Sequence, residues 1–399
     1  MNNNFYGLHM FNSSNNTITN NIIYFNLGRG IKMEYSSYNS FIGNNVLHDG
    51  GLSSYYSYHT LIKNNDFRYA FGGVFFKDSS DIILEKNFIT GIAWSAIDLI
   101  RSPRAEISNN EIINNGDYGV FLQSSPYITI TDNIIRNNER DGIVLRGQGN
   151  IVTGNIIENN GDGYYDGGIT IEDCKDSVIT DNLILNNSNG IRITTRTSNN
   201  TVTRNIISYS DIAGIDTYAS GNNIVYLNNF IGNNVTTDCY NSTNKYDNGV
   251  FGNYWSDYDG RDKDGDGIGD TPKYIEENSF NDSYPLMVPY GPNTSIRITT
   301  PREGYIYFRN IRLKPISSNI VFGNIKIKAS AANYMNNTVK VEKVEFYVDG
   351  RLRWVDRTVP FSWRWRLSSP LKHNHTISVI VYDSSGETAV DEMQTWRFL

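Results

Sequence analysis

An asparagine that recurs every 20 to 27 residues, a nine-residue acidic loop and a closing run of alternating strands together predict an all-β protein. The asparagine repeat predicts a right-handed parallel β-helix of about ten coils over residues 1–234. The acidic loop marks a cap segment with a calcium-binding loop over residues 235–292. The alternating strands predict a β-sandwich over residues 293–399.

The repeat is clearest when the chain is aligned on one asparagine per coil. These anchors are Asn21, Asn45, Asn65, Asn87, Asn110, Asn133, Asn155, Asn182, Asn205 and Asn229. An apolar residue stands two positions after every anchor, and segments such as GVFLQ and GIVLR follow about ten residues later. Those segments alternate with a period of two, as a strand with one buried face does. Three short strands in about 23 residues leave no room for a helix, and the leucine consensus of leucine-rich repeats is missing.

The anchor itself has a predicted structural role. Each coil must turn sharply between strands, and asparagine tolerates the left-handed backbone conformation better than any residue except glycine. We therefore expect the anchors to adopt that conformation. Strands of neighbouring coils lie about 4.8 Å apart, so the amides of successive anchors are expected to hydrogen-bond into a ladder.

Charge is distributed unevenly along the chain. Residues 1–292 carry a net charge of −14 and residues 293–399 a net charge of +7, which supports a domain boundary near residue 292. The basic residues of the second part are scattered along alternating strands, so we expect no nucleic-acid partner. No run of eighteen apolar residues predicts a transmembrane segment. The two cysteines, Cys174 and Cys239, are expected to be free thiols, with a single disulfide bond as the alternative.

The segment DKDGDGIGD, residues 262–270, has the spacing of a calcium loop. Its candidate ligands are Asp262, Asp264, Asp266, the main-chain carbonyl of Ile268, and Asp270. Lys273 stands where an EF-hand would place its closing glutamate, so further ligands are expected from Asp257 or Asp259. Carboxylates this close together repel one another unless a cation neutralises them, which predicts a structural Ca²⁺. The alternative is a solvated acidic turn.

One outer face of the β-helix carries the candidate catalytic residues. If the residue after each strand-opening glycine points inward, charged side chains of both signs point outward along the coils. Lys77, Asp98, Arg146, Glu172, Arg192 and Asp216 are the candidates for gripping a uronate and supplying an acid and a base. The alternative is a solvated β-face.

Tyrosines are the candidate carbohydrate-binding residues. Tyr55, Tyr56 and Tyr58 are expected in a loop between coils, and Tyr164 and Tyr165 stand in the longest spacing of the repeat. Tyrosine offers a flat face and a hydroxyl group, which suit a pyranose ring. The alternative is that these rings pack over the edge of a coil.

The C-terminal part has about seven alternating strands in about 105 residues, as a β-sandwich does. Trp354, Trp363 and Trp365 are candidates for ligand binding. Trp363 and Trp365 share one face of a strand, which favours a place in the core for that face.

Three resemblances extend these predictions. The repeat N-x-I-x-N-N…G-I-x-L resembles the pectin-lyase-like right-handed β-helices of carbohydrate-binding proteins and sugar hydrolases. The segment GNYWSDYDGRDKDGDGIGDTPKYIEENSFNDSYPL, residues 252–286, resembles the closing motif of the exported NosD-like proteins, named after a copper accessory factor. The segment VEFYVDG…PFSWRWRL…HTISVIVYDSSGETA resembles bacterial and archaeal Ig-like modules. The predicted architecture is therefore a right-handed parallel β-helix followed by a calcium-loop cap and an Ig-like β-sandwich.

The resemblance to NosD-like proteins implies an exported protein, located extracellularly or at the cell surface. The N-terminus resembles the second half of a repeat and has no signal peptide, so we expect the chain to begin mid-repeat. Binding of a polysaccharide or glycoconjugate, with cell-surface proteins as further partners, is the function we expect. A polysaccharide lyase, epimerase or hydrolase acting on the β-helix face is the alternative, and copper handling is a third hypothesis. Copper requires clustered histidine, methionine or cysteine, which the five histidines do not provide in sequence.

Overall fold

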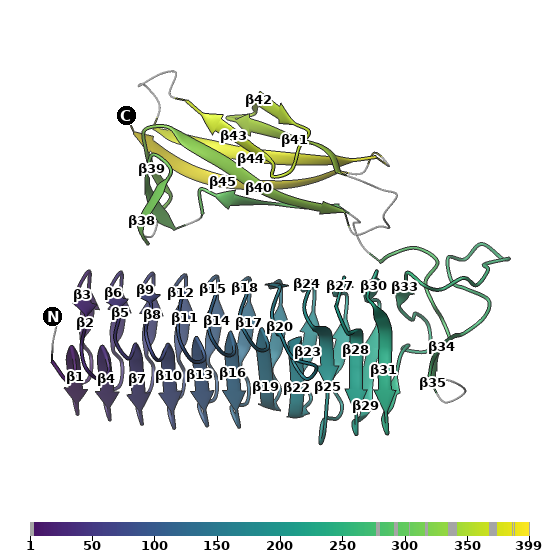
Figure 1. Ribbon diagram of the computed structural model, residues 1–399, viewed down its shortest axis with the longest axis horizontal. Coiled ribbons are helices and arrows are strands. Elements are labelled where there is room, and N and C mark those ends of the chain that lie inside the picture. The colour runs from purple at the N-terminus through teal and green to yellow at the C-terminus, as the bar shows by residue number, and fades with distance from the viewer. Residues whose placement is uncertain are drawn as a thin grey trace. The chain divides into compact units, whose positions relative to one another are not determined.

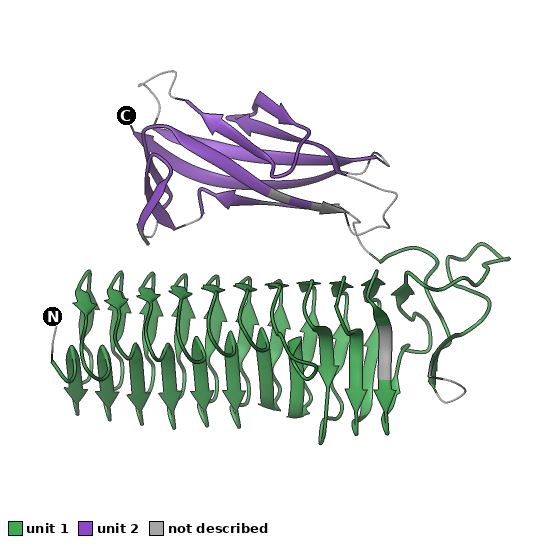
Figure 2. Cartoon of the chain, in the orientation of Figure 1, with its two compact units in different colours: residues 1–290 green, residues 291–399 purple. Residues whose placement is uncertain are grey.

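Every regular element of the chain is a β-strand in the computed structural model, which describes residues 4–276, 280–290, 294–302, 304–315, 318–333, 341–366, 373–384, 386 and 388–398. The chain divides into two units, residues 1–290 and 291–399 (Figure 2). Among the described residues, no helix is long and apolar enough to cross a membrane.

The first unit is a parallel β-helix in which each coil contributes one strand to each of three eleven-stranded sheets (Figure 1). Sheet 1 contains β1 (Leu8–Phe11), β4 (Ile31–Glu34), β7 (Leu52–Tyr55), β10 (Val74–Lys77), β13 (Ile97–Ile100), β16 (Val120–Gln123), β19 (Ile143–Gln148), β22 (Gly167–Lys175), β25 (Asn189–Ile193), β28 (Ala213–Tyr218) and β31 (Val235–Tyr240). Sheet 2 contains β2 (Thr17–Thr19), β5 (Ser40–Ile42), β8 (Leu61–Lys63), β11 (Ile83–Glu85), β14 (Glu106–Ser108), β17 (Thr129–Thr131), β20 (Ile151–Thr153), β23 (Val178–Thr180), β26 (Thr201–Thr203), β29 (Gly221–Tyr226) and β32 (Thr243–Lys245). Sheet 3 contains β3 (Ile22–Tyr24), β6 (Asn45–Leu47), β9 (Asp66–Arg68), β12 (Phe88–Thr90), β15 (Glu111–Ile113), β18 (Ile134–Arg136), β21 (Ile156–Glu158), β24 (Leu183–Leu185), β27 (Ile206–Ser208), β30 (Asn229–Ile231) and β33 (Tyr254–Trp255). We number the coils 1 to 11 by these triplets, so coil 1 holds β1 to β3.

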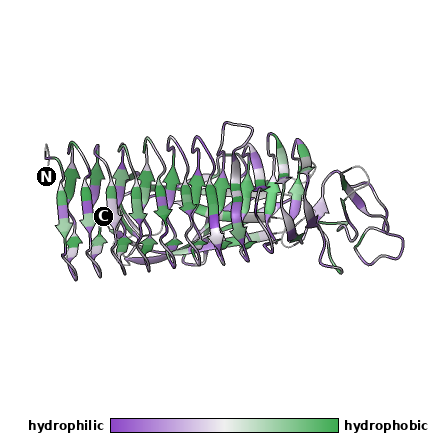
Figure 3. Cartoon of the chain, turned by 90° about the horizontal axis from the view of Figure 1, so that it is seen from below, coloured by the Kyte–Doolittle hydropathy of each residue, from purple (hydrophilic) through white to green (hydrophobic). Residues whose placement is uncertain are grey.

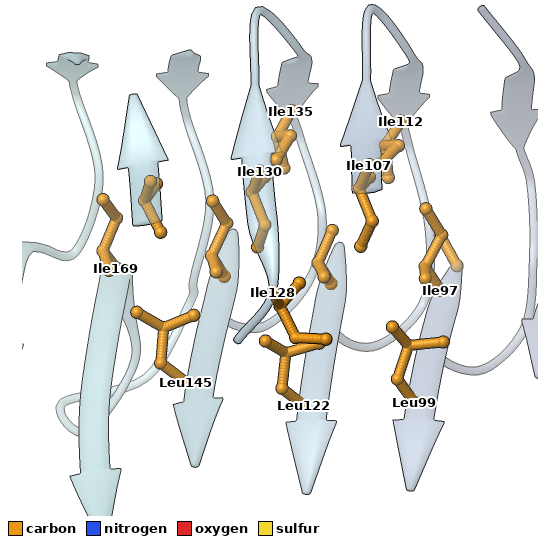
Figure 4. Close-up of a cluster of buried hydrophobic side chains, with 14 of the residues drawn as sticks. Ile97, Leu99, Ile107, Ile112, Leu122, Ile128, Ile130, Ile135, Leu145 and Ile169 are labelled. Atoms are coloured by element: carbon orange, nitrogen blue, oxygen red, sulfur yellow. The ribbon is translucent and has the colours of Figure 1, made fainter. Parts of the chain in front are cut away.

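The core of the β-helix consists of aliphatic residues stacked coil upon coil. Figure 4 shows Ile97 and Leu99 of sheet 1 pointing inward beside Ile107 of sheet 2 and Ile112 of sheet 3, and the pattern repeats in the next coils. These four side chains are fully buried. In Figure 3 hydrophobic residues recur along the strands of successive coils, whereas hydrophilic residues gather at the turns. The alternation in the sequence therefore marks the inward face of each strand.

The predicted asparagine ladder is present. It runs through Asn21, Asn44, Asn65, Asn87, Asn110, Asn133, Asn155, Asn182, Asn205, Asn228 and Asn253. At each step the side-chain Nδ2 and the main-chain N–H donate to the Oδ1 of the next rung, at 3.0 and 2.8 Å from Asn110 to Asn133. Nδ2 also donates to a main-chain carbonyl of the preceding coil.

Two of the predicted anchors are wrong by one residue. Asn44 and Asn228 occupy the rungs that we assigned to Asn45 and Asn229. Both positions are tandem asparagines, so the repeat alone offers two alignments. The core decides between them, because Val46, two residues after Asn44, is fully buried.

The predicted backbone conformation of the anchors is also wrong. The left-handed residue in this turn stands one position before each of the first ten rungs, as at Asn109 (φ 56°), Asp132 (φ 55°) and Gly154 (φ 68°). The rungs themselves do not have positive φ. The rung places its amide over the neighbouring coils, and the residue before it makes the turn.

The cap closes the end of the β-helix around a buried carboxylate. Trp255 stacks on Phe230 of the preceding coil at 4.4 Å between ring centroids. Asp282 accepts hydrogen bonds from the main-chain N–H of Asn253, the last rung, at 2.6 Å and from Trp255 Nε1 at 2.7 Å. Burial raises the pKa of Asp282 to about 6. The hairpin of the cap pairs β34 (Lys273–Glu276) with β35 (Phe280–Asp282), and the predicted boundary at residue 234 falls just before β31, so coil 11 lies beyond the predicted β-helix.

The second unit is a β-sandwich. Its sheets contain three strands in the order β36-β40-β43 and seven strands in the order β38-β37-β39-β45-β44-β41-β42. The strands are β36 (Thr294–Thr300), β37 (Tyr305–Phe308), β38 (Ile311–Pro315), β39 (Ile320–Phe322), β40 (Ile325–Asn333), β41 (Val341–Val348), β42 (Arg351–Asp356), β43 (Ser362–Trp365), β44 (Asn374–Asp383) and β45 (Thr388–Phe398). Ile325 and Ile327 of the small sheet and Val344 and Phe346 of the large sheet are fully buried.

Candidate functional site

The outer face of sheet 1 places the charged columns where the sequence predicts them. Asp98 pairs in register with Phe75 and Phe121 of the adjacent coils, and Arg192 pairs with Asp216. Inward neighbours such as Ile97 have no exposed surface, whereas Asp98 is partly exposed.

Four of the six candidate catalytic residues form two ion pairs. The Arg146 guanidinium lies 2.7 Å from the Glu172 carboxylate, and Arg192 Nε lies 2.8 Å from Asp216 Oδ2. Only 9% of the Arg192 side chain is exposed, whereas 32% of the Arg146 side chain is. The Arg146–Glu172 pair is therefore more accessible to a ligand.

A hollow lies at the corner that follows the strands of sheet 1, beside the Arg146–Glu172 pair. Its volume is about 1040 Å³. It is lined by Gln123, Ser124, Pro126, Arg146, Gly147, Gln148, Glu172, Asp173, Lys175, Arg196, Thr197, Ser198, Ala219, Gly221 and Asn222. These residues come from coils 6 to 10, which are four inter-coil steps or roughly 19 Å of the β-helix. We call this hollow, with its lining residues, the corner groove.

A short corner in coil 7 interrupts the regular stacking beneath the corner groove. The corners of coils 6 and 8 have two left-handed residues three positions apart, as at Ser124 and Tyr127. Coil 7 is one residue shorter than coil 8 within its first strand: Leu145 pairs with Ile171 but Gly147 pairs with Cys174, so the register of β19 with β22 shifts between Leu145 and Gly147. A Cβ atom on Gly147 would lie 2.8 Å from the main-chain oxygen of Ser125, so the chain approaches its neighbour closely here.

The charges of the corner groove are partly compensated. Arg196 lies 2.6 Å from Asp173, and 70% of its side chain is exposed. The Arg196 guanidinium lowers the pKa of Asp173. Lys175 forms no ion pair within the described part of the chain, so the lining carries three cations and two carboxylates. Such a surface can bind hydroxyl groups and carboxylates of a ligand.

Asp98 is the candidate residue whose protonation is most perturbed on this face. Burial between the two phenylalanines, with a further contribution from the charge of Asp117, raises its pKa to about 6. Its Oδ1 atom is buried and has no hydrogen-bond partner. Lys77, at the end of the neighbouring strand β10, belongs to the adjacent outward column. A carboxyl group with this pKa is suited to accept and return protons near neutral pH.

The segment between β21 and β22, where the repeat has its longest spacing, forms a loop that covers part of sheet 1. Tyr164 and Tyr165 stand in this loop, with 60% and 71% exposure. The Arg192 guanidinium donates to the Tyr165 carbonyl and lies over the Tyr165 ring. Beneath the loop, burial raises the pKa of Asp141 to about 7, and Asp141 accepts hydrogen bonds from Thr170 and the N–H of Gly167.

The other candidate tyrosines lie elsewhere on the β-helix. Tyr55 ends strand β7, so its predicted place in a loop is wrong, whereas Tyr56 and Tyr58 follow in the turn and are about two-fifths exposed. Coil 3 and the loop before coil 8 are five inter-coil steps apart, roughly 24 Å, so the five tyrosines do not form one site.

Tyr35, Tyr38 and His59, which are not among the candidates predicted from the sequence, join the predicted Tyr56 in an exposed aromatic cluster on the corner that also forms the groove. Tyr35 stacks on Tyr56 at 5.1 Å between ring centroids, and Tyr38 stacks on His59 at 4.6 Å. All four residues have positive φ, which places them at equivalent turn positions of successive coils. Their spacing of 21 residues, equal to the local repeat, is the signal that would have revealed them.

The acidic loop of the cap brings three predicted ligands together. One carboxylate oxygen each from Asp262, Asp264 and Asp266 lies within 4.8 Å of the others. Asp262 also accepts hydrogen bonds from the N–H groups of Gly265 and Gly267. Asp270 accepts from the N–H of Lys263 at 3.0 Å.

Asp257, expected as a further ligand, instead forms an ion pair with Lys273 at 2.7 Å. The main-chain oxygen of Ile268 lies next to the cluster in sequence, and oxygen-only donors of this kind suit a hard cation. The structure thus brings Asp262, Asp264 and Asp266 together.

The soft donors do not converge. His48 is stacked between aromatic rings, and His9 contacts Glu34 at 3.0 Å. Cys174 and Cys239 are both buried and are not joined by a disulfide bond, as predicted. Within the described residues, no histidine or cysteine belongs to a group of three potential metal ligands.

Three family models match the chain. The model described as "Periplasmic copper-binding protein (NosD)" matches residues 48–167 and 93–260. The "Right handed beta helix region" model matches residues 1–93, and the "Bacterial Ig domain" model matches residues 295–379. These matches confirm the right-handed β-helix and the Ig-like module, and with them the three resemblances stated from the sequence.

Several solved structures are similar to parts of the chain. The A-module of the Azotobacter vinelandii mannuronan C-5 epimerase AlgE6 has 11% identity and a TM-score of 0.45, with 57% of this chain and 80% of that chain covered. The periplasmic alginate epimerase AlgG has 14% identity and a TM-score of 0.38, with 57% and 74% covered. Tailspike protein 2 of Escherichia coli O157:H7 bacteriophage CAB120 has 10% identity and a TM-score of 0.43, with 96% and 59% covered.

The chain spans 53% of the structure of the Clostridium thermocellum CbhA fibronectin(III)-like modules, at 24% identity and a TM-score of 0.21, and 51% of an AlgG double mutant. Identities below 25% with TM-scores below 0.5 transfer no chemistry to this chain. No curated protein matches the chain.

Proposed function

The chain belongs to the NosD family, whose model matches more than half of it, and from this premise we propose that it is an exported protein whose β-helix binds a polysaccharide along the corner groove. The family description places its proteins in the periplasm, which supports export. The corner groove supports the site, and its open, charged lining from five coils is the observation that carries the proposal.

The dimensions of the corner groove favour a linear polymer. Residues from coils 6 to 10 line it, so a chain of linked sugar rings lying along the β-helix axis would contact several coils at once. The Arg146–Glu172 and Arg196–Asp173 pairs are accessible donors and acceptors for hydroxyl groups, and Lys175 is available for a carboxylate.

The same corner carries the aromatic cluster of coils 2 and 3, about three inter-coil steps or roughly 14 Å before the groove. Exposed tyrosine rings offer a flat surface for pyranose rings. The rings of Tyr56 and Tyr58 would extend the binding surface towards the N-terminal end of the β-helix.

We also propose that Ca²⁺ stabilises the cap. Asp262, Asp264 and Asp266 would hold the ion through carboxylate oxygens, with Ile268 and Asp270 completing the predicted set. Mutual repulsion raises the pKa of Asp264, although the N–H of Asp266 opposes it, and a bound cation relieves such repulsion. The role is structural, because the loop belongs to the segment that closes the β-helix.

Acid–base chemistry on sheet 1 is the second candidate function. Asp98 supports it through its raised pKa and its unpartnered buried oxygen. Asp98 would take a proton from a bound sugar and return it, and Lys77 would stabilise the negative charge that develops. A proton returned to the same carbon gives epimerisation, and a proton passed to the leaving glycosidic oxygen gives a lyase reaction. In a hydrolase, Asp98 would instead donate a proton to that oxygen while water attacks the sugar.

Copper binding, which the family description names, does not fit the donors of this chain. A copper site needs imidazole or sulfur ligands that converge. Here Met10 and Met33 point into the core, and the described histidines stand in separate stacks and pairs. We therefore assign no copper step to the chain.

The test is affinity electrophoresis of the full chain on a panel of neutral and acidic polysaccharides. The double variant Lys175→Gln/Arg196→Gln removes two exposed cations of the corner groove, and we expect at least a tenfold loss of affinity. Lys245→Gln, which removes an exposed lysine of sheet 2, is the matched control and should bind within twofold of the parent. Unchanged binding by the folded double variant would overturn the site.

A further inference from the structure

The small sheet of the second unit presents a row of cations on its outer face. In the antiparallel pairing of β40 with β43, Ile325 lies opposite Trp365 and both are buried, so Lys326 lies opposite Arg364 on the other side. Lys328 and Arg366, two positions along each strand, share that side. Arg309 lies near its end. We call Arg309, Lys326, Lys328, Arg364 and Arg366 the cationic face.

The cationic face has no internal compensation. None of its five residues forms an ion pair within the described part of the chain, where the second unit pairs Lys343 with Glu345 and His375 with Asp349. Like charges directly opposite each other across two strands are destabilising. Lys326 and Arg364 are such a pair, so they repel each other, and a bound anion would reduce this repulsion.

Two hollows adjoin the cationic face and share Arg364 and Arg366. One, of about 480 Å³, is lined by Arg309, Asn310, Asn324, Arg364 and Arg366. The other, of about 530 Å³, is lined by Arg353, Trp354, Ser362, Trp363, Arg364, Trp365 and Arg366. No carboxylate lines either hollow. Arginine side chains therefore converge on concave space from two sides.

A buried arginine adds positive charge beneath the tryptophans. The Arg397 guanidinium lies 3.9 Å from the centroid of the Trp365 ring and donates to the Trp365 carbonyl at 3.0 Å. Its other contact is the Gly323 carbonyl, at 3.2 Å, so its partners are neutral. Trp354, at the second hollow, is 51% exposed.

We propose that the cationic face and its two hollows bind an anionic polysaccharide, one that bears carboxylate or phosphate groups along its chain. Guanidinium groups bind carboxylates and phosphates through two parallel N–H donors, and the exposed indole of Trp354 covers the flat face of a sugar ring. A lipid bilayer presents a broad flat surface that does not enter such hollows. A nucleic-acid duplex is likewise too wide for them, which leaves single-stranded nucleic acid as the competing ligand that the experiment separates.

This site is independent of the corner groove in the first unit. The Ig-like module alone carries it, and its net charge has the opposite sign to that of the β-helix and cap. Failure of either site leaves the other unaffected, and separate variants address each.

The experiment measures binding of the full chain to polygalacturonate, with uncharged dextran and a single-stranded oligonucleotide as comparison ligands, at low and at physiological salt. The variant Arg364→Gln/Arg366→Gln is expected to lose at least tenfold in affinity for polygalacturonate. Arg357→Gln removes one exposed charge outside both hollows and should stay within twofold. Near-UV circular dichroism of the buried Trp365 reports whether the variant is folded.

The second variant Lys326→Gln/Lys328→Gln keeps both arginines and should also weaken binding at low salt, while raising the midpoint of thermal unfolding because a repulsive pair is removed. Equal affinity of the parent and both folded variants for polygalacturonate would overturn the proposal. Tighter binding of the oligonucleotide than of polygalacturonate at equal charge would overturn the choice of a glycan.

Discussion

The asparagine ladder makes a quantitative prediction at Asn133. Its Nδ2 donates to the carbonyls of Ile107 and Thr131 at 2.8 and 3.0 Å and to Asn155 Oδ1 at 2.9 Å. Its Oδ1 accepts from the N–H and the Nδ2 of Asn110 at 2.8 and 3.0 Å. All of these atoms are buried or nearly so. Asn133→Gly removes the five hydrogen bonds together.

The loss in the free energy of unfolding depends on which buried groups are left without a hydrogen-bond partner. The main-chain N–H of Asn110 loses its acceptor, Asn133 Oδ1, and a buried unsatisfied donor costs about 1–3 kcal/mol. Asn110 Nδ2 keeps the Leu84 carbonyl and Asn155 Oδ1 keeps the N–H of Asn133, so those losses are about 1 kcal/mol or less each. With the backbone entropy of glycine, about 0.5–1 kcal/mol, the total is about 2 to 6 kcal/mol.

Asp132→Gly is the matched control. Asp132 has the left-handed conformation (φ 55°), and Gly154 already stands at the equivalent place of the next coil. Glycine adopts that conformation freely, so the free energy of unfolding should change by less than about 1 kcal/mol. Urea titrations followed by far-ultraviolet circular dichroism measure both values. If Asn133→Gly were as stable as Asp132→Gly, the ladder would not contribute to the stability of the β-helix.

Three further predictions concern buried and clustered carboxyl groups. Because the pKa of Asp141 rises from 3.8 to about 7 on folding, the free energy of unfolding should fall by up to about 4 kcal/mol between pH 4 and pH 7. Urea titrations of Asp141→Asn should show a smaller dependence on pH. An unchanged dependence would contradict the assignment. Chelation of Ca²⁺ should lower the thermal unfolding midpoint of the parent, because an ion present at a hundredfold excess over its Kd contributes about 3 kcal/mol to the free energy of unfolding. The variant Asp264→Asn/Asp266→Asn should show no such shift. Equal shifts of parent and variant in calorimetry would argue against the site. If the outer face of sheet 1 catalyses a reaction of a polyuronate, Asp98→Asn should abolish the unsaturated or epimerised product but should still bind the polymer. The rate of the parent should change near pH 6. An active Asp98→Asn variant would exclude Asp98 as the acid–base group.

The sequence was sufficient for the architecture because one periodicity governs both buried faces and turns. The spacing of Asn110, Asn133 and Asn155 predicted a ladder, and the structure stacks them. It was insufficient where neighbouring residues are chemically equivalent. The tandem asparagines before Val46 fit the repeat in two ways, and only the burial of Val46 chooses between them.

The conformational role of the anchors could not be read from residue type. Asparagine favours both the left-handed turn and the buried amide ladder, and the chain uses Asp132, Lys86 or Arg204 for the turn because that position faces solvent. The ladder position must supply both a donor and an acceptor over two coils, which asparagine does and aspartate does not.

The candidate site was only partly predictable. The outward columns follow from strand alternation, so Arg146, Glu172 and Asp98 fell on the correct face. The corner groove contains Gly147, where coil 7 lacks one residue and the register with coil 8 shifts. In the sequence this difference appears only as a spacing of 22 in place of 23 residues between Asn133 and Asn155. The raised pKa of Asp98 depends on Phe75 and Phe121, which are 23 residues away in either direction.

A crystal structure of the chain with the oligosaccharide that binds best in the polysaccharide panel tests the proposed binding site most directly. We predict sugar rings in the corner groove, in contact with Arg146, Lys175 and Arg196 and running along successive coils. Sugar bound only outside the corner groove, with these three side chains unchanged and solvated, would contradict it.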